Sequence, residues 1–124
     1  MQWKDVISHY EQLISENFDY VPLLEIVKKI TNSKYVNSVF PTFSHDALII
    51  SRADNFRESF NYPSICIQYF GEEEFKVSYS PNSRQTHNIS KLYCNFKDVW
   101  SYLESLFLRQ RIETDLIKYK DSNL

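Results

Sequence analysis

The first segment of the chain alternates apolar and polar residues at the spacing of an amphipathic helix. Residues 3–14 place Val6, Tyr10 and Leu13 on one face, and charged side chains occupy much of the rest. After a polar break, Pro22 stands where a first helical turn tolerates proline, and a second apolar face follows it. The pattern therefore predicts an N-terminal helical hairpin whose shared apolar surface covers a sheet.

Short strands are expected after the helices. Segments 34–40 and 46–51 have the composition of strands, and Pro41 together with residues 44–46 marks the connection between them. Residues 52–62 are polar and irregular. They predict the longest loop before the sheet resumes.

The strongest strand pattern lies in residues 64–80. Apolar side chains alternate from Ile65 onward and again from Phe75, on either side of a break at residues 70–74. The single glycine of this break suits a tight connection, so the two runs predict a hairpin. A further strand is expected over residues 89–94.

Asn95 and Asp98 mark the start of the last helix. An Asn side chain at this place accepts a bond from a free backbone N–H, and an Asp in the first turn complements the helix dipole. Apolar residues recur at helical spacing as far as Ile112, and segment 113–124 is either a frayed extension or disordered. We expect one α+β domain over residues 1–124, with a helical hairpin, a mostly antiparallel sheet of about five strands and a C-terminal helix.

Composition narrows the classes of function. Fourteen Lys and Arg against sixteen Asp and Glu give a formal charge of -2 without a long block of either sign. A dedicated nucleic-acid binder normally carries a basic stripe, so this pattern argues against that class. With one Gly in the chain, the Gly-rich phosphate loops of nucleotide-binding folds are excluded. The chain starts on an amphipathic pattern and holds no apolar run near the ~20 residues that span a bilayer, which predicts a cytoplasmic protein.

Candidate chemistry is sparse. Residues 44–46 read Ser-His-Asp, but neighbours on one loop cannot form a nucleophile, base and orienting acid, which are assembled from distant parts of a fold. His87 with Cys94 is the other conceivable pair, and it requires the loop before Cys94 to fold back. Cys66 and Cys94 read as small buried hydrophobes, since a cytosolic setting disfavours a disulfide. The spacing of His and Cys matches no metal motif, so we expect no catalytic, metal or cofactor site and no enzyme.

Three segments are poorly explained by core building. They are an acidic hairpin tip, the polar loop at residues 81–88, and the loop at residues 54–62, which mixes charged residues with aromatic residues that are typical anchors for a partner. The candidate interface comprises Asp54, Phe56, Tyr62, Glu72, Glu73 and Glu74. Two other interpretations stay open: Phe56 and Phe60 fold inward to cap the core, and the three glutamates form a solvated turn that keeps the hairpin edge from pairing.

Three segments carry a resemblance to a known class of proteins. They are Phe-Asp-Tyr-Val-Pro-Leu-Leu-Glu-Ile-Val at 18–27, Val-Phe-Pro-Thr-Phe-Ser-His-Asp-Ala-Leu-Ile-Ile at 39–50, and Phe-Lys-Val-Ser-Tyr at 75–79. With these segments, a small α+β domain without chemistry resembles the immunity proteins of bacterial contact-dependent growth inhibition and polymorphic toxin systems. The resemblance implies a cognate toxin domain, often a nuclease, that is held inactive by direct binding. The basic groove in which such a toxin holds phosphates would then face carboxylates of this chain such as Glu72.

Two other functions remain open from the residues alone. A non-toxin adaptor, for instance a phage or mobile-element protein that binds and inhibits a host factor, would show the same surface features. A cofactor-free enzyme would need a polar cleft, and no pattern in the sequence indicates one. The identity of the partner separates the first two hypotheses, and mutation of His45, His87 and Cys94 tests the third.

Overall fold

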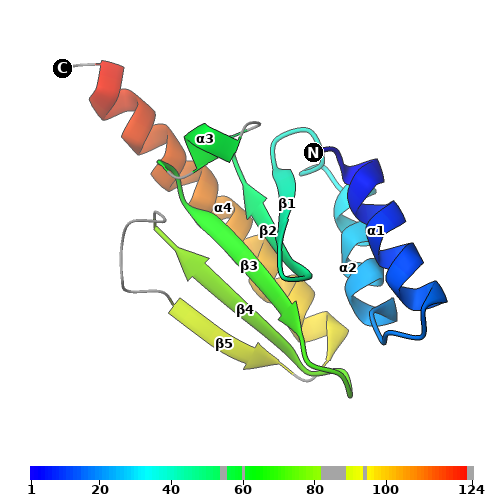
Figure 1. Cartoon of the computed structure of the whole chain (residues 1–124). Coiled ribbons are helices and arrows are strands. Elements are labelled where there is room, and N and C mark those ends of the chain that lie inside the picture. The colour runs from blue at the N-terminus through cyan, green and yellow to red at the C-terminus, as the bar shows by residue number, and fades with distance from the viewer. Residues whose placement is uncertain (54–55, 60, 82–88, 94, 123–124) are drawn as a thin grey trace.

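The protein has two N-terminal helices, a five-stranded antiparallel sheet and a C-terminal helix, which confirms the expected α+β class (Figure 1). The computed structural model describes residues 1–53, 56–59, 61–81, 89–93 and 95–122. The elements are α1 (Trp3–Ser15), α2 (Val21–Thr31), β1 (Phe40–Ser44), β2 (Ala47–Ser51), α3 (Phe56–Ser59), β3 (Ser64–Tyr69), β4 (Phe75–Ser80), β5 (Ile89–Tyr93) and α4 (Phe96–Ser122). Within this part of the chain, none of the helices combines the length and apolar character that crossing a bilayer requires.

The sheet is a meander in which each strand pairs antiparallel with the next, in the order β1-β2-β3-β4-β5. Ile50, Ile65 and Tyr79 stand opposite one another in successive strands and are all buried. The neighbouring register row holds Ile49 and Cys66, which are only half-buried on the other face. Alternate residues therefore give the sheet one core face and one more polar face.

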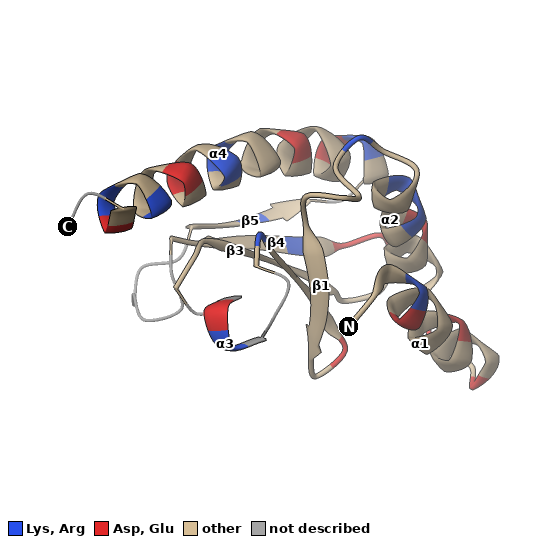
Figure 2. Cartoon of the chain, turned by 90° about the horizontal axis from the view of Figure 1, so that it is seen from above, with Lys and Arg blue, Asp and Glu red and all other residues tan. Residues whose placement is uncertain are grey.

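The helices cover the core face and one edge of the sheet. Figure 2 shows α4 along one face of the sheet and the short α3 on the other side. Helix α1 packs on α2 and on β1, and the Tyr10 hydroxyl donates to the backbone oxygen of Asp46 at 2.9 Å. Val99, Leu103 and Phe107 of α4 are buried together with the apolar faces of both N-terminal helices. One hydrophobic core thus joins all the layers.

The first strand begins later than the sequence pattern predicted. Residues 34–39 form turns, and β1 starts at Phe40 and continues through Pro41, which was expected to lie in a connection. Proline lacks a backbone N–H, but β1 is an edge strand, where a missing donor can face away from the ladder. Pro41 is buried opposite Ile50, so packing of its ring accompanies its place in the strand.

Two segments are more helical than the apolar pattern required. Segment 52–62, expected as a loop, contains the short helix α3. For segment 113–124 an extension of the helix and disorder were both open, and α4 continues past Ile112 to Ser122. Gln110 and Thr114 are buried on the inner face of α4, and Gln110 Nε2 donates to the backbone oxygens of Ile50 and Pro63. Polar residues on the buried face weaken the apolar periodicity, and this is why the pattern of hydrophobic residues ends before the helix does.

Local signals at two turns are confirmed by backbone geometry. The Asn95 side chain accepts a bond from the Asp98 N–H at 2.9 Å, as expected for the cap of α4. His45 and Asp46 form the two-residue connection between β1 and β2, with φ angles of 49° and 66°. Two consecutive positive φ values are typical of the type I′ turn that matches the twist of a hairpin.

Candidate protein-binding groove

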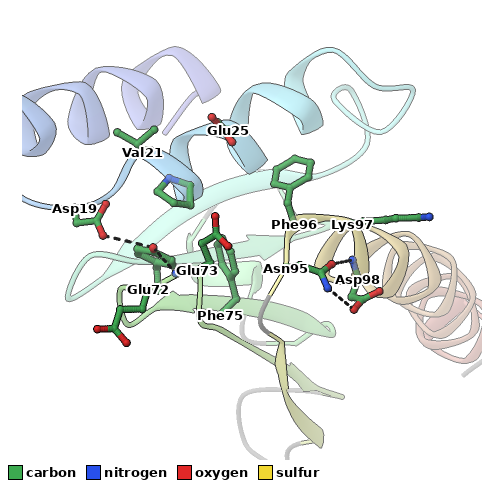
Figure 3. Close-up of a pocket in the computed structure, with 12 residues that line it drawn as sticks. Asp19, Val21, Glu25, Glu72, Glu73, Phe75, Asn95, Phe96, Lys97 and Asp98 are labelled. Carbon is green, nitrogen blue, oxygen red and sulfur yellow. Dashed lines mark hydrogen bonds between the residues drawn. The ribbon is translucent and has the colours of Figure 1, made fainter.

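A groove of about 900 Å³ opens at one end of the sheet, where three segments far apart in the sequence meet (Figure 3). It lies between the first turn of α2, the connection from β3 to β4, and the first turn of α4. The tight turn at residues 70–74 and the starts of α2 and α4 bring these segments together. The groove is therefore a product of topology rather than of one sequence motif.

The groove is strongly acidic. Its carboxylates are Asp19, Glu25, Glu72, Glu73 and Asp98. All five are exposed, and Lys97 is the one cation among the described lining residues, which gives the lining a formal charge of -4. Figure 3 shows Lys97 extending away from the groove, while Glu73 points up between α2 and the start of α4. A surface of this kind attracts a basic partner and repels an acidic one.

Apolar side chains form the floor between the carboxylates. They are Val21, Pro22, Phe75 and Phe96. Phe75 is buried in the core, whereas Val21 is 47% exposed and offers contact area to an incoming chain. An apolar centre surrounded by charge matches the general anatomy of protein interfaces, which have a desolvated centre and a polar rim.

Tyr69 links the segment between α1 and α2 to the turn between β3 and β4. Its hydroxyl receives a hydrogen bond from the backbone N–H of Glu73 at 2.9 Å and lies 3.5 Å from an Asp19 carboxylate oxygen. Its ring packs in a tilted arrangement against Phe75, with centroids 4.8 Å apart. Burial raises the pKa of Tyr69, and the nearby carboxylate of Asp19 adds to this rise. The phenol therefore stays protonated at neutral pH and holds two sides of the groove in register.

The dipole of α4 stabilises one of the five carboxylates. Asp98 stands in the first turn of α4, where a partial positive charge favours a carboxylate, and it accepts a hydrogen bond from the Asn95 side chain at 2.8 Å. The first turn of α2 holds no acidic residue, so the other four carboxylates have no such role. Of these four, Asp19, Glu72 and Glu73 lie in connections between elements and are the best candidates for contacts with a partner.

The structure places the residues of the predicted interface at separate sites. Glu72 and Glu73 line the groove, while Glu74 is half-buried at the base of the turn, with its N–H bonded to the Gly71 oxygen at 2.9 Å. Tyr62 precedes β3 and the glutamates follow it, so they lie at opposite ends of this strand, and the Tyr62 ring contacts Lys118 at 5.6 Å from its centroid.

Part of the predicted interface lies outside the described residues. This applies to Asp54, to the side chain of Phe56, to Phe60 and to residues 82–88. The prediction that Phe56 either anchors a partner or folds inward therefore stays a prediction.

Other acidic residues of the groove were not recognised from the sequence. Asp19 and Glu25 are single charges near a helix start, and no local spacing distinguishes them from ordinary surface residues. Asp98 was recognised only as a helix-start residue. Long-range packing alone brings them beside Glu73.

The Ser-His-Asp run is a structural turn. The Asp46 carboxylate accepts a hydrogen bond from His9 Nε2 at 3.0 Å, and the His9 ring packs in a tilted arrangement on Phe43 with centroids 4.2 Å apart. These contacts give the partly buried His9 a structural role between α1 and the first hairpin. His45 and Ser44 are exposed at the turn.

Cys66, the cysteine among the described residues, has no feature of a reactive thiol. Cys66 is a free cysteine, half-buried rather than fully buried, and burial raises the pKa of its thiol. A raised pKa opposes formation of the reactive thiolate. His87 and Cys94 lie outside the described residues. Among the side chains that are described, no three His, Cys, Asp or Glu gather in a way that could hold a metal ion.

Comparison of the chain with protein-family models, with curated proteins and with solved structures found no match.

Proposed function

We propose that the acidic groove binds a basic surface on a protein partner, and that the chain acts as an immunity protein which neutralises a cognate bacterial toxin domain in the cytoplasm. In this proposal the chain works by direct complex formation and carries out no catalysis. The observation that carries the proposal is the groove itself, with five carboxylates around an apolar floor.

The chemistry of the groove favours a toxin that handles nucleic acid. A nuclease holds phosphates in a cleft rich in Lys and Arg, and such a cleft is complementary to the -4 charge of the groove lining. Asp19, Glu72 and Glu73 would pair with those cations and exclude the substrate. Val21 would supply desolvated contact area at the centre of the complex.

A charge-reversed variant tests the groove. Tagged wild type and a triple variant, Asp19→Lys with Glu72→Lys and Glu73→Lys, are expressed in the native host, and captured proteins are identified by mass. We expect the wild type to capture one toxin domain in equal amounts and the variant to lose it. Co-expression with the isolated toxin domain should restore growth for the wild type only.

A matched control separates the groove from net charge. The triple variant Glu11→Lys, Glu16→Lys and Asp121→Lys makes the same change in charge with exposed residues outside the groove lining. It should capture the toxin domain and protect as the wild type does. Equal loss in both variants would mean that the groove is not the binding face, and a stoichiometric partner that is not a toxin would favour the adaptor hypothesis.

A further inference from the structure

A second pocket, of about 240 Å³, lies at the other end of α2 from the acidic groove. It is bounded by Lys34 and Tyr35 in the turns after α2, by Arg52 after β2, and by the middle of α4. At roughly 30 Å³ of liquid volume per water molecule, this space corresponds to about eight waters. It is large enough for a phosphate group that carries a small organic substituent.

Positive charge dominates the pocket. Lys34, Arg52 and Arg111 line it together with one carboxylate, Glu104, so its lining has a formal charge of +2. The Tyr35 hydroxyl donates to Glu104 at 3.2 Å and occupies one oxygen of this carboxylate. None of the three cations forms an ion pair with a carboxylate among the described residues.

The two guanidinium groups are close enough to disturb one another. Burial is the main cause that lowers the pKa of Arg52. The carboxylate of Asp115, on the next turn of α4, raises this pKa, and the neighbouring charge of Arg111 lowers it by a smaller amount. An anion placed between Arg52 and Arg111 would relieve this repulsion and take advantage of the partial desolvation.

We propose that this pocket binds the phosphate group of a phosphomonoester through Arg52, Arg111 and Lys34. Guanidinium forks match the tetrahedral oxygens of phosphate in a bidentate manner, and a doubly charged anion matches the +2 lining better than a carboxylate does. The ring of Phe107 and the side chain of Leu108 line the same pocket and offer an apolar wall to the organic part of the ligand. This proposal is independent of the acidic groove, because the two sites share no lining residue.

Phosphate titration followed by two-dimensional NMR of the ¹⁵N-labelled full chain tests the site. Sodium phosphate and phenyl phosphate are added at constant ionic strength, with chloride replacing them in the reference series. We expect saturable shifts confined to the amides of residues 34–35, 52–53 and 104–111, and at least tenfold weaker binding for Arg52→Gln with Arg111→Gln. The matched variant Lys118→Gln with Lys120→Gln changes the same charge on α4 outside the pocket lining and should bind as the wild type does.

The outcomes separate the site from nonspecific attraction and identify the source of the phosphate. Linear, unlocalised shifts, or equal binding by the pocket and control variants, would overturn the proposal. The single variant Arg111→Gln changes an exposed residue and repeats the test if the double variant does not fold. Tighter binding of a phosphotyrosine peptide than of phenyl phosphate would identify a phosphorylated protein as the ligand, and the reverse order would identify a small phosphomonoester.

Discussion

Replacing Gln110 with Leu should destabilise the protein measurably, because this buried amide links α4 to both ends of the segment that carries α3. Gln110 has no exposed surface, and its Nε2 donates to the backbone oxygens of Ile50 and Pro63 at 3.0 and 2.9 Å. Leucine has a similar size but donates nothing, so Gln110→Leu removes both bonds without creating a large cavity.

The expected magnitude follows from counting buried polar groups. Each buried carbonyl that loses its partner costs about 1–3 kcal/mol, and two of them are affected. The Gln110 Oε1 is buried and has no hydrogen-bond partner among the described residues. Its removal by the substitution therefore offsets the free-energy cost of about one of the two unpaired carbonyls. The net loss in free energy of unfolding should therefore be about 1–3 kcal/mol.

Urea unfolding monitored by circular dichroism measures this loss. With a slope of about 2 kcal/mol per molar urea, a loss of about 2 kcal/mol lowers the midpoint by about 1 M. Gln12→Leu on the exposed side of α1 is the control, and it should stay within about 0.5 kcal/mol of the wild type. If Gln110→Leu is as stable as this control, the two hydrogen bonds do not stabilise the fold and the reasoning is refuted.

Three further changes test local features by the same unfolding assay. Asn95→Ala should lose about 1 kcal/mol because it removes the cap of α4, and an unchanged midpoint would show that the cap contributes nothing. His45→Asn should gain about 0.5 kcal/mol, since Asn tolerates the positive φ of this turn better, and a loss would contradict the assignment of strain. Burial first, and then the bond to Glu113, raises the pKa of Tyr79 above the unfolded value of about 10, so stability should hold below pH 10 and fall as pH rises beyond it. Tyr79→Phe should flatten that alkaline decline, and an unaltered slope would assign the decline to other groups.

Much of the fold could be predicted because the relevant signals are local. Alternation around residues 64–80 and the glycine at position 71 specify the central hairpin, and the spacing of apolar residues specifies α1 and α2. The start of β1 could not be predicted, since a proline inside a strand is acceptable only at an edge, and the order of strands is not local information. The end of α4 was left open between a helical extension and disorder, because the buried residues Gln110 and Thr114 are polar and interrupt the apolar pattern.

The candidate site was predictable only in part for the same reason. Glu72 and Glu73 stand out as a charged turn in the sequence, but their acidic partners come from α2, α4 and the connection before α2. Tyr62 was grouped with them because it is an aromatic residue near charges, yet the length of β3 separates them. Charge runs can be read from a sequence, whereas the neighbours of a charge require the topology.

The most direct test of the acidic groove is the rate at which the captured toxin domain associates with the wild type and the two charge-reversed triple variants, measured at low and high salt. The groove variant should associate at least tenfold more slowly than both others at low salt, with the difference shrinking near 1 M salt, where the Debye length falls to about 3 Å. Equal rates for the groove and control variants would show that Asp19, Glu72 and Glu73 do not steer the partner, and would contradict the assignment of this groove as the binding surface.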